Sequence, residues 1–187
     1  MTLQKRANYL KDYDIVPDAN GKQQLVYHGI YYQFRVSGAQ WTAYKRKLLL
    51  FGCLNLFLLC AASLLDPASL RGSGALYVSL PYLALFFPVI LGLGRVLHLQ
   101  KKAPKLERMD YDQCVTSLSL CTIASIVIAV AAFLGQVLSL FLLPAMALHD
   151  ALAALCFLLV AACCWRSHLL QRAHPCDNIG KQTPIEG

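Results

Sequence analysis

In a chain of 187 residues, a hydrophobic share of 57% and a charged share of only 14% exclude an ordinary soluble domain, because soluble domains carry roughly 45–50% and 25%. The net charge of +7 does not indicate a nucleic-acid partner, because no basic stripe with interleaved aromatic residues accompanies it. The charged residues gather instead in blocks, chiefly 1–47 and 95–112, between long uncharged stretches. This distribution is typical of a multi-pass membrane protein.

The first segment, residues 1–40, predicts a small cytoplasmic β-hairpin or three-stranded meander. Its turn is expected at residues 18–21, where Asn-Gly tolerates the positive φ of a tight hairpin. Residues 25–28 and 30–36 are rich in Tyr, Val and Phe and alternate as a half-buried strand does, and residues 13–16 supply a further strand. Strands this short bury too little to be stable alone. We therefore expect the segment to dock on the central loop, the membrane surface or a partner.

An interfacial helix followed by the first membrane span is predicted over residues 41–66. Ser37 and Gln40 have the spacing of a capping box, in which each side chain bonds the other residue's backbone N–H. Aromatic and basic residues at the start of a span are typical of the lipid headgroup level. We accordingly expect five side chains to act as interfacial anchors: Trp41, Tyr44, Lys45, Arg46 and Lys47.

The rest of the chain predicts three further spans, because each apolar run approaches the 20 residues that cross a bilayer core about 30 Å thick. Asp110 with Gln113 has the spacing of a helix cap before the third span. Pro81 and Pro88 predict a kink in the second span. The segments are a second span at 75–98, a basic cytoplasmic loop at 99–113, a third span at 114–138, a fourth span at 145–166, and a cytoplasmic, largely disordered tail at 167–187.

The orientation follows from the basic residues, because cytoplasmic loops of membrane proteins collect Lys and Arg. With four spans, 16 of the 17 Lys and Arg residues fall on one side, and only Arg71 lies on the other. Both termini are therefore expected in the cytoplasm. The predicted fold class is an all-α four-helix bundle in the cell membrane with a small β-rich N-terminal segment.

Ionisable groups inside a span are the usual place to look for function, because each is costly in hydrocarbon. In this chain they gather toward the outer end and predict an ion or substrate cluster of five residues: Gln136, His149, Asp150, Asp66 and Arg71. The alternative is structural, because an acid in the first turns of a helix is favoured by the helix dipole.

Two other sets of residues carry weaker hypotheses. Cys53, Cys121 and Cys156 are predicted at similar depth, and three thiolates at one level are a ligand set for a metal or an iron–sulfur cluster. The alternative is that they are small apolar packing residues. Asn55 in the first span and the hydroxyl stripe Ser119, Thr122 and Ser125 in the third indicate close packing of helices.

No P-loop, GxSxG, HExxH or CxxC motif occurs, so no catalytic residue, cofactor or metal is expected. The sequence favours a non-enzymatic membrane subunit that packs against a larger membrane complex, such as a transport complex, or against further copies of itself. One alternative is a small oligomeric transporter or channel that uses the polar cluster around Gln136, His149 and Asp150. The other is a membrane redox protein that uses the intramembrane cysteines.

Overall fold

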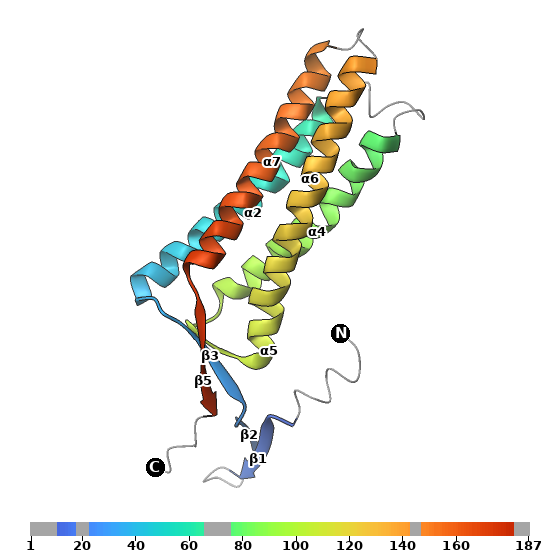
Figure 1. The fold of residues 1–187 in the computed structure, drawn as a ribbon. Helices are drawn as coiled ribbons and strands as arrows, with labels where there is room; N and C mark the ends of the chain where they lie inside the picture. Colours follow the sequence, from blue (N-terminus) through green and yellow to red (C-terminus); the bar gives the residue numbers. More distant parts are fainter. Residues whose placement is uncertain (1–10, 18–22, 66–75, 143–146, 182–187) are drawn as a thin grey trace.

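The computed structural model describes residues 11–17, 23–65, 76–142 and 147–181 (Figure 1). In these ranges it contains four helices that are long and apolar enough to cross a membrane, as the sequence predicted. Helix α6 continues a short helix, α5, through one π-helical turn, η1. The helical elements are α2 (Gly38–Leu64), α4 (Leu76–Gln100), α5 (Arg108–Tyr111), η1 (Asp112–Thr116), α6 (Ser117–Leu142) and α7 (Ala147–Ala173).

The four long helices form a closed bundle in which α2 packs on α4, α4 on α6, α6 on α7, and α7 on α2 (Figure 1). Helix α2 begins as predicted: the backbone N–H of Gln40 donates to Ser37 Oγ at 3.4 Å, and that of Ser37 to Gln40 Oε1 at 3.0 Å. Helix α4 runs without interruption through Pro81 and Pro88. The buried residues of α2 recur at intervals of about three, four and seven, which is the spacing of one helix face: Trp41, Tyr44, Leu48, Asn55, Leu59 and Ala62.

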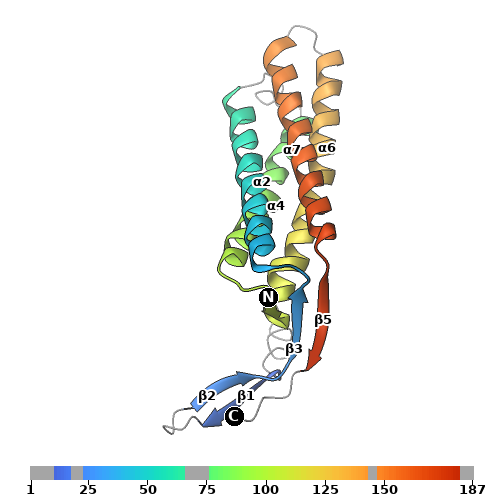
Figure 2. The same ribbon diagram turned by 90° about the vertical axis from the view of Figure 1, so that its left-hand side faces the viewer.

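Five short strands lie at one end of the bundle, called here the sheet end (Figure 2). Strands β1 (Tyr13–Pro17) and β2 (Gln23–Tyr27) form an antiparallel hairpin. Strand β3 (Ile30–Phe34) does not extend this hairpin into the meander that its alternation suggested. It is instead the central strand of a second sheet, between β4 (Lys105–Glu107) and β5 (Cys176–Lys181).

The C-terminal segment differs from the largely disordered tail expected from its composition. Helix α7 continues to Ala173, and β5 then pairs antiparallel with β3. The pairing supplies hydrogen-bond partners for the backbone N–H and C=O groups of residues 176–181. The polar sequence of these residues does not by itself predict a strand. Part of the predicted docking of the N-terminal segment is thereby explained, since β3 pairs with both the central loop and the tail.

An aromatic core joins this sheet to the bundle. Phe34, the last residue of β3, is buried against the rings of Trp41 and Tyr44, with centroid distances of 4.7 and 5.8 Å. Leu106 from β4 and Cys114 from η1 complete the same buried cluster. Because these residues come from strands and helices alike, the sheet and the bundle share one core at this end.

Helices α4 and α6 approach each other closely at Gly135. A β-carbon at this position would lie 2.8 Å from the backbone carbonyl oxygen of Tyr77, whereas Gly94, also in α4, has open space where a β-carbon would be. Small residues at such crossings let helix backbones pack closely. The crossing therefore depends on the absence of a side chain at Gly135.

We expect Gly135→Ala to lower the stability of the bundle by about 1–3 kcal/mol, because the new methyl group must push two backbones apart. The matched control is Gly94→Ala, which should leave stability unchanged or raise it by up to about 1 kcal/mol, since alanine is the better helix former. Thermal unfolding in mild detergent, followed by circular dichroism, measures both. Equal midpoints for the two variants would contradict the close crossing.

Candidate functional sites

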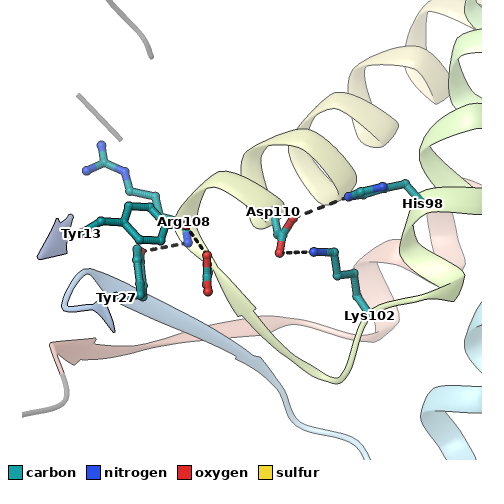
Figure 3. Close-up of polar contacts among 7 residues, drawn as sticks. Tyr13, Tyr27, His98, Lys102, Arg108 and Asp110 are labelled. Atoms are coloured by element: carbon teal, nitrogen blue, oxygen red, sulfur yellow. Dashed lines mark hydrogen bonds and ion pairs between the residues drawn. The ribbon is translucent and has the colours of Figure 1, made fainter. Parts of the chain in front are cut away.

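The first polar site lies where the sheet joins the bundle. Asp110, in the first turn of α5, is buried and accepts a hydrogen bond from Lys102 Nζ at 2.7 Å, while His98 Nε2 lies 3.6 Å from its other carboxylate oxygen (Figure 3). The predicted cap with Gln113 is not formed, because the helix begins three residues earlier, with Glu107 and not Asp110 at the N-cap position. Asp110 instead ties the end of α4 and the following loop to the start of α5.

The hairpin is attached beside this site through tyrosine side chains. Tyr13 Oη donates to a carboxylate oxygen of Glu107, and Tyr27 Oη accepts from the backbone N–H of Arg108 at 3.1 Å (Figure 3). Tyr27 Oη also donates to the carbonyl of Ile30 at 2.9 Å. The Tyr27 ring contacts the Tyr13 ring, with centroids 5.0 Å apart. The rings and hydroxyl groups of tyrosines thus supply most of the described contacts that attach β1 and β2 to the rest of the protein.

Three of the five expected interfacial anchors, Trp41, Tyr44 and Lys45, make contacts inside the protein. Trp41 and Tyr44 are buried in the aromatic core, and Trp41 Nε1 donates to the carbonyl of Lys102 at 3.1 Å. Lys45 Nζ donates to the carbonyls of Gln100 and Lys102 at 2.8 and 3.2 Å, where a cation complements the end of α4. Trp41 and Lys45 therefore bind the loop after α4. Arg46 and Lys47 are exposed.

The second polar site lies at the far end of the bundle, where the sequence predicted an ion or substrate cluster. Gln136 and Asp150 are both buried, and Gln136 Nε2 donates to Asp150 Oδ1 at 2.7 Å, which joins α6 to α7. His149, the residue before Asp150 on α7, is exposed on another face. Asp66 and Arg71 lie outside the described residues. Of the described members, the structure thus brings Gln136 and Asp150 together and separates His149 from them.

A third polar site is a small cavity inside the bundle, in its sheet-end half. Asn55 Nδ2 donates to Cys164 Sγ at 3.3 Å, while Asn55 Oδ1 is buried and has no hydrogen-bond partner among the described residues. The cavity is about 30 Å³ in volume, and Thr122, Ser125 and Ser167 contribute hydroxyl groups to its lining. A cavity of this size and polarity has room for a single water molecule. The sequence marked Asn55 and the hydroxyl stripe as packing residues, but not the space between them.

Cys53, Cys121 and Cys156 do not come together as one group in the described structure. Cys53 is exposed on α2, and Cys121 lines the small cavity. Cys156 packs against the apolar core around Phe157. Among the described residues, no three His, Cys, Asp or Glu side chains lie in a group that would hold a metal ion.

Comparison with known proteins adds no assignment, because no protein-family model, curated protein or solved structure matches the chain. Any function must therefore be argued from the geometry of these three sites and of the surface.

We expect Asp110→Asn to destabilise the folded protein by about 1–3 kcal/mol, because it removes the charge that Lys102 and His98 face at a buried position. Asp177→Asn is the matched control, since Asp177 pairs with Arg35 at the exposed edge of β5. An exposed pair contributes roughly 0–1 kcal/mol, so the control should change little. Chemical unfolding in detergent measures the difference, and two equal losses would contradict the role given to Asp110.

The Tyr13 phenol should ionise well above its ordinary range. Burial raises its pKa, and the hydrogen bond to Glu107 and the negative charge of that carboxylate raise it further. The folded-state pKa of Tyr13 lies above the unfolded value of about 10, so the contribution of this phenol to the stability of the folded state is complete below pH 10. That contribution is lost as the pH rises toward the folded-state pKa. The hairpin should therefore loosen at alkaline pH.

Glu107→Gln should move the Tyr13 titration to lower pH but not to the ordinary value, because the burial remains. The measurement is the tyrosinate absorbance titration of each protein minus that of the same protein carrying Tyr13→Phe. Asp14→Asn is the control, because this exposed neighbour is not among the groups that shift Tyr13. A Tyr13 titration near pH 10 in the parent protein would show that the Tyr13–Glu107 contact is absent.

Proposed function

We propose that the protein is a non-enzymatic, multi-pass subunit of the cell membrane that joins a partner protein through its cytoplasmic hairpin. The four long helices support the membrane placement, because each displays large apolar side chains on its outer face. Such a belt is unfavourable in water and is matched by lipid tails. It includes Leu50, Phe57, Leu83, Phe87, Leu120, Val127, Phe141 and Leu155.

The sheet end is placed in the cytoplasm in this proposal. Strands β1, β2 and β3, the loop between α4 and α5, and strand β5 all lie at that end (Figure 2). By the sequence count above, 16 of the 17 Lys and Arg residues fall on the side of these elements and the adjoining helix ends, and segments rich in these residues stay on the cytoplasmic side.

The hairpin is the observation that carries the partner-binding role. Among the described strands, β1 and β2 pair only with each other, and they extend beyond the sheet on the side away from the bundle (Figure 2). Ile15 in β1 is 64% exposed. A two-stranded hairpin is marginally stable in water, and its open edge is a template for an added strand. An extended segment of a partner protein would extend this sheet and cover Ile15.

The membrane placement is tested first. Alkaline carbonate should leave the chain in the membrane pellet, and protease or reporter fusions should find both termini on the cytoplasmic side. Release into the supernatant, or a terminus exposed outside the cell, would overturn the proposal before any partner is sought.

The partner role is tested by purifying the tagged full chain in mild detergent and measuring which chains remain at fixed stoichiometry. We expect Ile15→Lys to lose the partner while the thermal midpoint stays unchanged, because Ile15 is exposed in the isolated subunit. Ile179→Lys, on the exposed part of β5, is the matched control and should keep the partner. A monodisperse lone monomer, or equal loss by both variants, would contradict docking at the hairpin.

One observation favours a second candidate, a small oligomeric transporter or channel. Asp150 is an ionisable residue buried between two apolar helices, where Gln136 orients its carboxyl group. Buried carboxyl groups in membrane helices mark ion or proton paths in many proteins. Ion flux into liposomes containing the protein should then be abolished by Asp150→Asn. A flux that this substitution leaves unchanged would remove the assigned site.

A further inference from the structure

A groove runs between α6 and α7 at the sheet end, on the outer surface of the bundle. Its volume is about 400 Å³, and its walls come from α5, η1 and the first turns of α6 on one side and the last turns of α7 on the other. This groove is separate from the hairpin and from the small cavity around Asn55, which lies between the helices. It is also the larger of the two spaces by far.

The lining changes from polar to apolar along the groove. Tyr111 and Arg172 lie toward the sheet end, and Thr116 and Ser119 add hydroxyl groups further along α6. Leu120 and Ile123 continue the wall toward the middle of the bundle. A ligand that fits this gradient has an anionic or polar head and an apolar body.

The helix that forms one wall is irregular at this position. Residues Asp112–Thr116 form a π-helical turn between α5 and α6, and two residues of that turn, Val115 and Thr116, line the groove. A π-turn inserts an extra residue into the helix and is frequent at functional sites. Here it changes the register between Tyr111 and Ser119, so that residues from both sides of the turn face the same groove.

The opposite wall carries polar groups whose bonding is incomplete. Gln171 Nε2 donates to Thr122 Oγ1 at 3.1 Å, but Gln171 Oε1 is buried without a partner among the described residues, and so is His168 Nδ1. Arg172 is exposed and makes no ion pair within the described part of the chain. No acidic side chain is among the described residues that line the groove. The charge of the groove is therefore positive, and an anionic group would complement the exposed Arg172.

We propose that this groove binds the headgroup of an anionic phospholipid of the cytoplasmic leaflet. The Arg172 guanidinium would bind the phosphate, because its fork of N–H donors matches phosphate oxygens. The hydroxyl groups of a headgroup such as glycerol would form hydrogen bonds with the hydroxyl groups of Thr116 and Ser119. The glycerol backbone and the first acyl carbons would then lie along Leu120 and Ile123. Basic pockets between membrane helices on the cytoplasmic side have this chemistry in general.

The inference rests on the membrane placement and orientation proposed above, since both put the groove at headgroup depth with its apolar part toward the lipid tails. It does not depend on the partner protein. A free phosphate ion would use Arg172 but would leave the apolar wall uncovered, which is why a lipid is the occupant we infer.

The test uses the full chain, purified in mild detergent, with bound lipids counted by native mass spectrometry. Phosphatidylglycerol should be retained about fivefold more than phosphatidylcholine, and Arg172→Gln should remove most of that preference. Arg166→Gln is the matched control: Arg166 is exposed on the same helix, does not line the groove, and should keep the preference. Ser119→Leu, which fills the groove, should reduce the retention of both lipids.

Three results would overturn the lipid site. They are equal retention of the two lipids by the parent protein, equal loss from Arg166→Gln and Arg172→Gln, and displacement of phosphatidylglycerol by millimolar inorganic phosphate, which would identify a free-phosphate site. Failure of the membrane placement is recognised separately, because carbonate would then release the chain from membranes. A chain that stays in the membrane but shows no lipid preference would refute only the groove.

Discussion

The architecture at the sheet end depends on the backbone pairing of β3 with β4 and β5. This pairing joins three segments that are far apart in the chain, namely the stretch before α2, the loop after α4 and the end that follows α7. Phe34 at the end of β3 then inserts into the aromatic core with Trp41. Without β3 in the centre, the four helices would still pack on one another, but β4 and β5 would have no strand in common. The hairpin would also lose Glu107, the residue that binds Tyr13.

Within the apolar helices, most of the polar groups described above bond to other parts of the bundle. Gln136 bonds Asp150, Asn55 bonds Cys164, and Ser63 bonds Tyr82. Hydrocarbon offers no hydrogen bonds, so polar groups in membrane helices find partners inside the protein. Such bonds are as consistent with helix packing as with transport. We therefore place the proposed partner-binding function on the surface of the protein. The surfaces available for it are the hairpin and the groove beside α7.

The prediction of the polar residues from sequence was uneven, for reasons that particular residues illustrate. The Ser37–Gln40 capping box was identified correctly because a cap is a local feature of four consecutive residues. Asp110 and Trp41 were assigned from equally local patterns, yet their partners, Lys102 and the core around Phe34, come from other segments. The pair Gln136 and Asp150 could be nominated because both are rare residue types in apolar helices. That His149 would face away, whereas Asp150 bonds Gln136, depended on the rotation of α7.

Hydrophobicity by itself determined the four long helices, because the length and apolar content of a helix that can cross a membrane are properties of consecutive residues. The tertiary structure decided which strand pairs with which. Strand β5 could not be predicted from its polar sequence, because its partner strand β3 lies more than 140 residues earlier in the chain. The tertiary structure also decided the groove between α6 and α7, which no sequence pattern within either helix predicts. Pairing and grooves arise from the relative placement of distant segments, and a sequence pattern reports only on residues near one another in the chain.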